Sequence, residues 1–98
     1  MSEQIRIVAF IEARPGEAAA LEAAAHVCVA ATRQEAGCVE YTLQRDRSRP
    51  ECLVFVETWT DQAALDAHMA TPHFKAFMGA VERAGNGTVA IHRLEPLA

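Results

Sequence analysis

The segment ETWTDQAALDAHMATPHFKAF, residues 57–77, concentrates the residue types best suited to chemistry. It holds two of the four histidines, His68 and His73, the only tryptophan, Trp59, and Glu57 two residues before that tryptophan. Histidine exchanges protons near neutral pH and is also a common metal ligand. The segment could therefore form a proton-transfer pair, a metal site, or an ordinary part of a packed helix.

The spacing of the two histidines argues against a metal site. They are five residues apart with Pro72 between them, so they cannot share one helix face as the histidines of an H-x-x-x-H pair do. The three cysteines, Cys28, Cys38 and Cys52, form no C-x-x-C motif and none lies nearby in sequence. We therefore expect no metal, and the odd cysteine count favours reduced thiols in a cytoplasmic protein.

A proton-transfer pair is the more informative alternative. On an expected helix over residues 60–70, Ala64, Leu65, His68 and Met69 form a stripe that should face a sheet. Glu57 belongs to an otherwise apolar strand face, where a carboxylate must be paired or raised in pKa. We predict His68 as its partner. Two alternatives stay open: a buried Glu-His hydrogen bond without a catalytic task, or a Glu57 that binds an arginine.

Three other side chains are candidates with weaker support. His73 should occupy the second position of its helix, where it either reaches a substrate or is a half-exposed residue of the cap region. Tyr41 alternates with Val39 and Leu43, so its ring should be buried and its hydroxyl should find a partner in the core or on a substrate. His92, on the last expected strand, should lie on the sheet face toward a partner or solvent.

The expected elements alternate between strands and helices. Strands are predicted at residues 5–13, 39–46, 52–59 and 88–96, and the GNG of residues 85–87 is predicted as a turn. Helices are predicted at residues 14–37, with Gly37 as the C-terminal cap, at 60–70, and at 72–84 with Pro72 at the first position. This β-α-β-β-α-β order, with its second helix broken, predicts an α+β ferredoxin-like split βαβ fold in a single domain over residues 1–98.

Charge and hydropathy restrict the partners. Residues 5–13 are apolar on both strand faces, so the sheet face away from the helices should be covered, most simply by a second copy in a homodimer. A net charge of −4 argues against binding to nucleic acid. The chain contains no apolar run long enough to cross a bilayer and does not begin like a signal peptide, so we expect no membrane partner.

The segments EAGCVEYTLQRD, FVETW and ALDAHMATPHFKAF resemble the antibiotic biosynthesis monooxygenase family, especially its small quinol-monooxygenase-like members. The resemblance implies a dimeric α+β barrel with a pocket between the helices and the sheet of each subunit. It also implies oxygenation of quinols or polycyclic phenols by O₂ without metal, flavin or haem. Tyr41 follows the shared Gly37-Cys38, and the remaining positions in the shared motif are Glu57, Trp59, His68, Thr71 and His73.

The haem-degrading branch of these relatives is disfavoured. It carries a tryptophan about where His68 stands and an iron-ligand histidine near Met78, and the chain departs from that pattern at both places. We therefore expect a cofactor-independent monooxygenase of a small quinol or polycyclic phenol, with His68 as the base and Glu57 as its orienting carboxylate. The expected substrate-binding residues are Tyr41, Trp59, His73, Phe55 and Met69.

Two other functions fit the same residues. One is a non-catalytic dimeric barrel that binds a small molecule or responds to stress. The other is an isomerase that uses the His-Glu pair as a proton shuttle. A phosphorylated substrate for such an isomerase would require a basic pocket, for which only Lys75 and Arg83 of the second helix are available near the motif.

Overall fold

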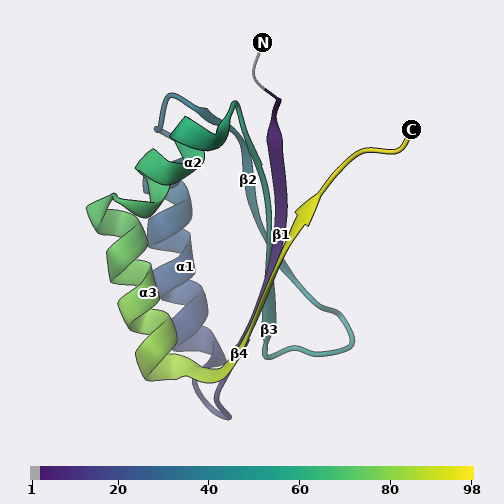
Figure 1. Cartoon of the computed structure of the whole chain (residues 1–98). Coiled ribbons are helices and arrows are strands. Elements are labelled where there is room, and N and C mark those ends of the chain that lie inside the picture. Colours follow the sequence, from purple (N-terminus) through teal and green to yellow (C-terminus); the bar gives the residue numbers. More distant parts are fainter. Residues whose placement is uncertain (1–2) are drawn as a thin grey trace.

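A computed structural model describes residues 3–98 as one antiparallel sheet with helices on one side (Figure 1). The element order is β1 (Ile5–Ala13), α1 (Ala18–Thr32), β2 (Cys38–Arg45), β3 (Cys52–Trp59), α2 (Gln62–Met69), α3 (Pro72–Ala84) and β4 (Gly85–Leu94). The strand order across the sheet is β2-β3-β1-β4. This arrangement confirms the predicted α+β ferredoxin-like fold, including the break between α2 and α3.

Helix α1 is shorter than predicted at both ends. Pro15 and Gly16 lie outside it, and Gly16 has a φ of 82°, a left-handed conformation that favours glycine and cannot continue into a helix. The helix ends at Thr32, and a series of turns covers the five residues before β2. Its buried side chains lie on one face and pack onto the sheet: Leu21, Ala25, Cys28, Val29 and Thr32.

Local capping explains the break between α2 and α3. The Asp61 carboxylate accepts a hydrogen bond from the Ala64 amide at 2.9 Å and so caps α2. The Thr71 hydroxyl accepts one from the Phe74 amide at 3.2 Å and donates one to the His68 carbonyl at 2.7 Å. Pro72 begins α3, where its missing N–H costs nothing. The Thr71 hydroxyl thus bonds to both the end of α2 and the start of α3.

Two strands depart from the predicted pattern. In β2, Cys38 pairs with Trp59 and Glu40 pairs with Thr58, so Val39 is an extra residue in a β-bulge. Val39 is consequently exposed, and the prediction that it shares a face with Tyr41 was wrong. Strand β4 begins at Gly85, so residues 85–87 are part of the strand and not the predicted turn.

The two faces of the sheet differ in their cover. The helix-facing side chains of β1 are buried, whereas Val8 and Phe10 on the opposite face are only partly buried. The neighbouring Val54 and Val56 of β3 are likewise partly buried. The Phe10 ring packs edge-on against the His92 ring, with 6.1 Å between the ring centroids. The outer face is therefore apolar at its centre and is left without cover by the described chain.

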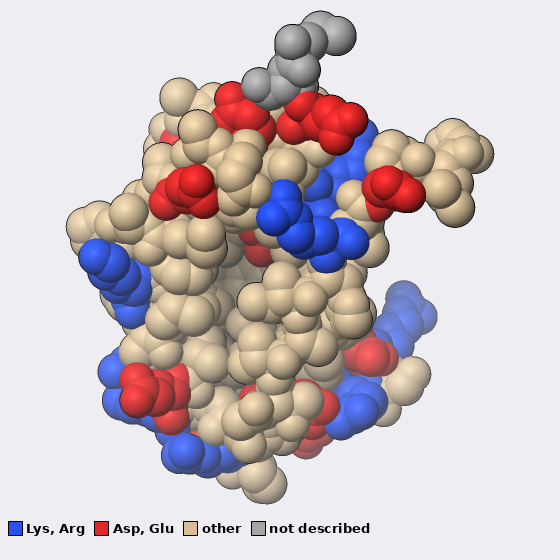
Figure 2. Space-filling model, viewed as in Figure 1, with Lys and Arg blue, Asp and Glu red and all other residues tan. Residues whose placement is uncertain are grey.

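The charged side chains form no extended basic patch on the face in Figure 2, where basic and acidic residues alternate. Arg45, at the end of β2, pairs with Glu22, and Arg49, in the turn before β3, pairs with Glu12. No helix in the described part of the chain is long and apolar enough to span a membrane.

Candidate active site

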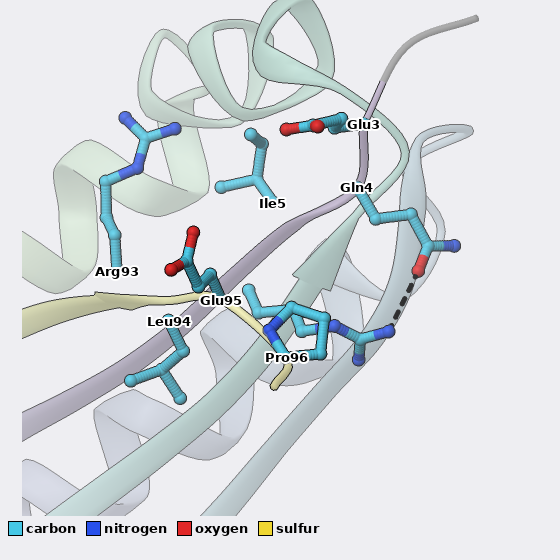
Figure 3. A pocket seen from close by; sticks show the side chains of 8 residues that line it. Glu3, Gln4, Ile5, Arg93, Leu94, Glu95 and Pro96 are labelled. Carbon is cyan, nitrogen blue, oxygen red and sulfur yellow. Dashed lines mark hydrogen bonds between the residues drawn. The ribbon is translucent and has the colours of Figure 1, made fainter. Parts of the chain in front are cut away.

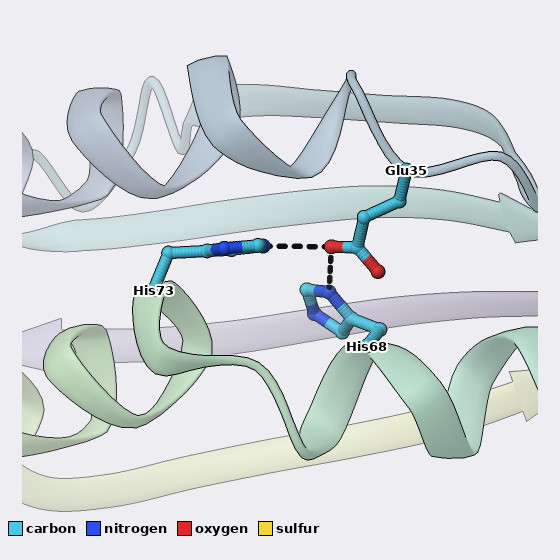
Figure 4. A group of neighbouring side chains, drawn as sticks. All are labelled: Glu35, His68 and His73. Atoms are coloured by element: carbon cyan, nitrogen blue, oxygen red, sulfur yellow. Dashed lines mark hydrogen bonds and ion pairs between the residues drawn. The ribbon is translucent and has the colours of Figure 1, made fainter.

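The break between α2 and α3 brings His68 and His73 together on one carboxylate. His68 Nδ1 lies 2.8 Å and His73 Nε2 lies 2.7 Å from the same oxygen, Oε2 of Glu35 (Figure 4). Pro72 keeps the two histidines off a common helix face, as expected, since His68 lies on α2 and His73 on α3. Because α3 starts in a new direction, both imidazoles nevertheless reach Glu35.

Glu35 was missed by the sequence analysis. It lies in the turn between α1 and β2, where no periodicity indicates which side chains point inward. Its position depends on Gly37, because a Cβ atom there would lie 2.2 Å from the Cβ of Ala64 in α2. The Thr60 amide also donates a hydrogen bond to the Gly37 carbonyl at 3.0 Å. Glycine thus allows the turn to lie directly against α2, which places Glu35 beside His68.

His68 is packed among aromatic rings. Its ring centroid lies 4.6 Å from that of Trp59, 5.0 Å from that of Phe74 and 5.4 Å from that of Tyr41, and the residue is only 2% exposed. An ionised carboxylate only accepts hydrogen bonds, so Nδ1 of His68 donates to Glu35 and Nε2 carries the free lone pair. No side-chain nitrogen or oxygen of the described residues is buried without a partner. Nε2 has no hydrogen-bond partner among residues 3–98, so a small part of its surface is accessible.

Glu57 does not make the predicted pair with His68. Its Oε1 accepts a hydrogen bond from Trp59 Nε1 at 3.0 Å, and no hydrogen bond joins it to His68 among residues 3–98. Burial raises the pKa of the Glu57 carboxyl above its ordinary value, although the Trp59 hydrogen bond and the nearby His68 favour the charged form. The carboxylate hydrogen-bonded to His68 is Glu35 and not the predicted Glu57.

Tyr41 is buried, as predicted, and sits directly across from Glu57 in the β2–β3 pairing. Its hydroxyl lies 3.9 Å from Cys28 Sγ, which in turn lies 3.6 Å from the Thr32 hydroxyl. Burial raises the pKa of Tyr41 far above its ordinary value, so the phenol stays neutral. In this conformation the hydroxyl points to α1, and the Tyr41 ring is the part that contacts His68.

The other predicted contact residues divide into two groups. Phe55 is 1% exposed and contacts Tyr41 at 5.5 Å and Phe77 at 5.3 Å between ring centroids, so it belongs to the aromatic cluster. Met69 is 42% exposed and does not face the sheet, contrary to the predicted stripe. The structure therefore assembles all the predicted site residues except Met69.

A cleft of about 520 Å³ lies between residues 3–6 and 93–96, and Arg93 points from β4 toward the helices there (Figure 3). None of the predicted site residues lines it. The surface is also hollowed between the helices and β4, with an acidic side chain at the bottom (Figure 2). Because Trp59 and Phe55 are fully buried, a substrate at His68 requires some side chains to move.

The Glu35 cluster also has the composition of a metal site. Glu35, His68 and His73 each offer one ligand atom, and the three atoms lie within 4.8 Å of one another. Two imidazole nitrogens and a carboxylate oxygen form the protein ligand set of several catalytic zinc sites.

Comparison with known proteins gives consistent results. A family model described as antibiotic biosynthesis monooxygenase matches residues 4–80. "Probable quinol monooxygenase YgiN" of Escherichia coli is 33% identical over 89 residues, covering 80% of this chain and 85% of that protein. The "Uncharacterized protein sll1783" of Synechocystis is 29% identical over 76 residues, and the chain spans about half of its length (52%).

Solved structures extend the likeness to the whole chain. The crystal structure of PA3566 from Pseudomonas aeruginosa superimposes with a TM-score of 0.92 at 40% identity, covering 100% of this chain and 98% of that one. The agreement includes all the elements that position the Glu35 cluster and the aromatic residues around it.

Proposed function

Because the chain belongs to the antibiotic biosynthesis monooxygenase family, we propose that it is a cofactor-independent monooxygenase of a small, electron-rich quinol or polycyclic phenol. The observation that carries the proposal is the state of His68. One ring nitrogen is fixed on Glu35, the other is free, and the ring lies in a cluster of aromatic side chains. This is the arrangement of a positioned base beside a site for an aromatic molecule.

The proposed chemistry needs a base and a dry cavity. Ground-state O₂ reacts slowly with closed-shell organic molecules, but a phenolate or carbanion can pass it one electron. His68 Nε2 takes the proton that creates this anion. With an anthrone-type substrate, a ring CH₂ and O₂ become a carbonyl and water, so the reaction balances without an external electron donor.

Each neighbouring residue has a role in this proposal. Glu35 holds the His68 tautomer and stabilises the imidazolium that forms, the task that the sequence analysis gave to Glu57. Trp59, Phe55 and Tyr41 form the aromatic wall, and the Glu57 carboxyl fixes the Trp59 indole. His73 supports Glu35 from the more exposed side, where its side chain is 22% accessible.

The close packing of the aromatic cluster favours one alternative, a non-catalytic dimeric barrel that binds a small molecule. In that function the buried side chains of Trp59 and His68 move only to admit a ligand, and no oxygen is consumed. The isomerase alternative has less support, because Lys75 and Arg83 are both exposed on α3.

An oxygen-electrode screen of metal-free protein against hydroquinones, anthrones and naphthols tests the proposal. We expect oxygen uptake with at least one class, undiminished by a chelator and without added flavin or haem. His68→Gln should lower turnover by about 10²- to 10⁴-fold, the usual cost of losing a general base. The matched control is His26→Gln, a histidine exposed on α1.

Full oxygen uptake in folded His68→Gln would remove the histidine from the chemistry. Ligand binding by a protein that consumes no oxygen with any of these substrates would favour the binding function.

A further inference from the structure

We propose that Glu35, His68 and His73 also form an inhibitory site for a divalent transition-metal ion, and that the ion is Zn²⁺. The binding part of this inference does not rest on the proposed monooxygenase function. It follows from the side chains that converge on Glu35 Oε2 and from what each of them can donate to a metal.

The three ligands come from three separate elements. Glu35 is in the turn after α1, His68 is in the last turn of α2, and His73 is in the first turn of α3. Imidazole nitrogen and carboxylate oxygen together suit Zn²⁺, which accepts three protein ligands and keeps a fourth position for water. No cysteine takes part in the cluster, which makes softer ions such as Cu(I) poorer candidates.

Zn²⁺ binding requires the three side chains to rearrange. Around tetrahedral Zn²⁺, with bonds of about 2.0–2.1 Å, ligand atoms lie about 3.3 Å apart. The two nitrogen–oxygen distances are now 2.8 and 2.7 Å, because each nitrogen donates a hydrogen to the same oxygen. Replacing those two hydrogens by one cation needs the oxygen to retreat by roughly half an ångström and the two imidazole nitrogens, which lie within 4.8 Å of each other, to take the same tetrahedral separation. Glu35 lies in a turn and His73 in the first turn of α3, so both can supply part of that movement.

Charge and access both favour a cation. The only ion-pair partners of Glu35 among residues 3–98 are the two histidines, so no lysine or arginine neutralises its carboxylate. The Glu35 and His73 side chains are 16% and 22% exposed, against 2% for His68. An ion can therefore enter from the His73 side and meet the buried His68 nitrogen last.

Zinc at this site would inhibit a base-catalysed reaction through the tautomer of His68. Without metal, Nδ1 carries the hydrogen and Nε2 has the free lone pair. When Zn²⁺ takes the Nδ1 lone pair, a neutral imidazole must carry its hydrogen on Nε2. The nitrogen that faces accessible space then becomes a donor and cannot accept a proton. Zn²⁺ on Nδ1 of His68 and acceptance of the catalytic proton by Nε2 therefore exclude each other.

Titration of tag-free, metal-free protein with Zn²⁺ in a calorimeter tests the site without any substrate. We expect one Zn²⁺ per chain and a higher melting temperature. His73→Gln and Glu35→Gln, both at partly exposed positions, should each weaken binding about tenfold or more. The matched controls are His26→Gln and His92→Gln, which remove exposed histidines elsewhere, and Cys38→Ser, which removes a partly buried thiol near Glu35.

Cobalt provides a spectroscopic test of the ligands. Co²⁺ bound by two imidazoles and a carboxylate should show visible d–d bands without an intense near-ultraviolet thiolate band, and His73→Gln should remove those bands. The proposal is overturned by an absence of stoichiometric Zn²⁺ binding, by unchanged binding in folded His73→Gln, or by a thiolate band that Cys38→Ser abolishes.

Activity separates this inference from the proposed function. If an oxidisable substrate is found, stoichiometric Zn²⁺ should suppress oxygen uptake and a chelator should restore it. Stoichiometric binding with undiminished turnover would retain the proposed oxygenase and reject inhibition. Stoichiometric binding by a protein without oxygenase activity would support the metal site and contradict the proposed function.

Discussion

At the scale of single residues, the Glu57 carboxyl links stability to pH. Burial raises its pKa in the folded protein above its ordinary value. As pH rises through the window between these two values, the unfolded chain loses its proton before the folded chain does. The folded state then binds more protons, so its free energy of unfolding falls with rising pH and levels off above the raised pKa.

We predict that Glu57→Gln removes this dependence. The amide keeps an oxygen to accept the Trp59 indole hydrogen bond and carries no charge, so the variant should gain stability relative to the wild type as pH rises from acid to neutral. Urea denaturation of both proteins across that range measures the difference. A constant difference at every pH would mean that Glu57 is not the source of the dependence.

The residue scale also shows which parts of the site could be predicted. His68 was predictable because helical spacing places it one turn after Leu65, on the side that faces the sheet. Glu35 was not predictable, because its direction is set by a turn and by a contact between Gly37 and Ala64 that is distant in sequence. The Glu57–His68 pairing failed because a nearer donor, the Trp59 indole, takes the Glu57 carboxylate.

At the scale of elements, the contact between the α1–β2 turn and α2 depends on Gly37. We predict that Gly37→Ala destabilises the protein by about 1–3 kcal/mol, the usual cost of overpacking, because its methyl group would collide with Ala64. It should also weaken Zn²⁺ binding by displacing Glu35. Chemical denaturation and metal titration check both effects.

Gly79→Ala is the matched control for that change. Gly79 lies within α3, and an added Cβ there would meet only the flexible end of the Arg83 side chain at 3.3 Å. Alanine is the better helix former, so this variant should be stabilised by about 0.5–1 kcal/mol. Equal stability changes in the two variants would show that the Ala64 contact is unimportant.

Element boundaries were predictable where local chemistry determines them. The α2–α3 break follows from Thr71 and Pro72, whose capping and missing N–H act within a few residues. The Val39 bulge was not predictable, because a strict alternation of side chains carries no information about an extra residue in the pairing with β3. The length of α1 was overestimated because the helix was assumed to continue to Gly37 as its C-terminal cap, whereas it ends at Thr32 and turns follow.

At the scale of the whole molecule, the apolar outer face of the sheet would be more stable if a second chain covered it. We predict a homodimer in solution in which two sheets stack face to face and cover Phe10 and Val56. Light scattering should give twice 10.6 kDa, and Phe10→Lys should lower this to the mass of one chain.

Val27→Lys is the control for the dimer test. Val27 is a similarly apolar residue that is 71% exposed, but it lies on α1, on the other side of the sheet. It should leave the mass unchanged. A wild-type protein that scatters as a single chain, or a Val27→Lys protein that dissociates while Phe10→Lys does not, would contradict stacking through the sheet.

The strand order β2-β3-β1-β4 has a consequence for how the chain folds during synthesis. Of these four strands, β1 leaves the ribosome first, and it is a central strand whose two neighbours are β3 and β4. Ala9 can therefore pair with Phe55 only after β3 emerges and with Ile91 only after β4 emerges. Contacts so distant in sequence slow folding and leave an apolar strand unpaired in the meantime. The nascent chain should therefore depend on holdase chaperones until its last strand emerges, and ribosome-bound chains stalled before residue 85 should remain sensitive to proteases.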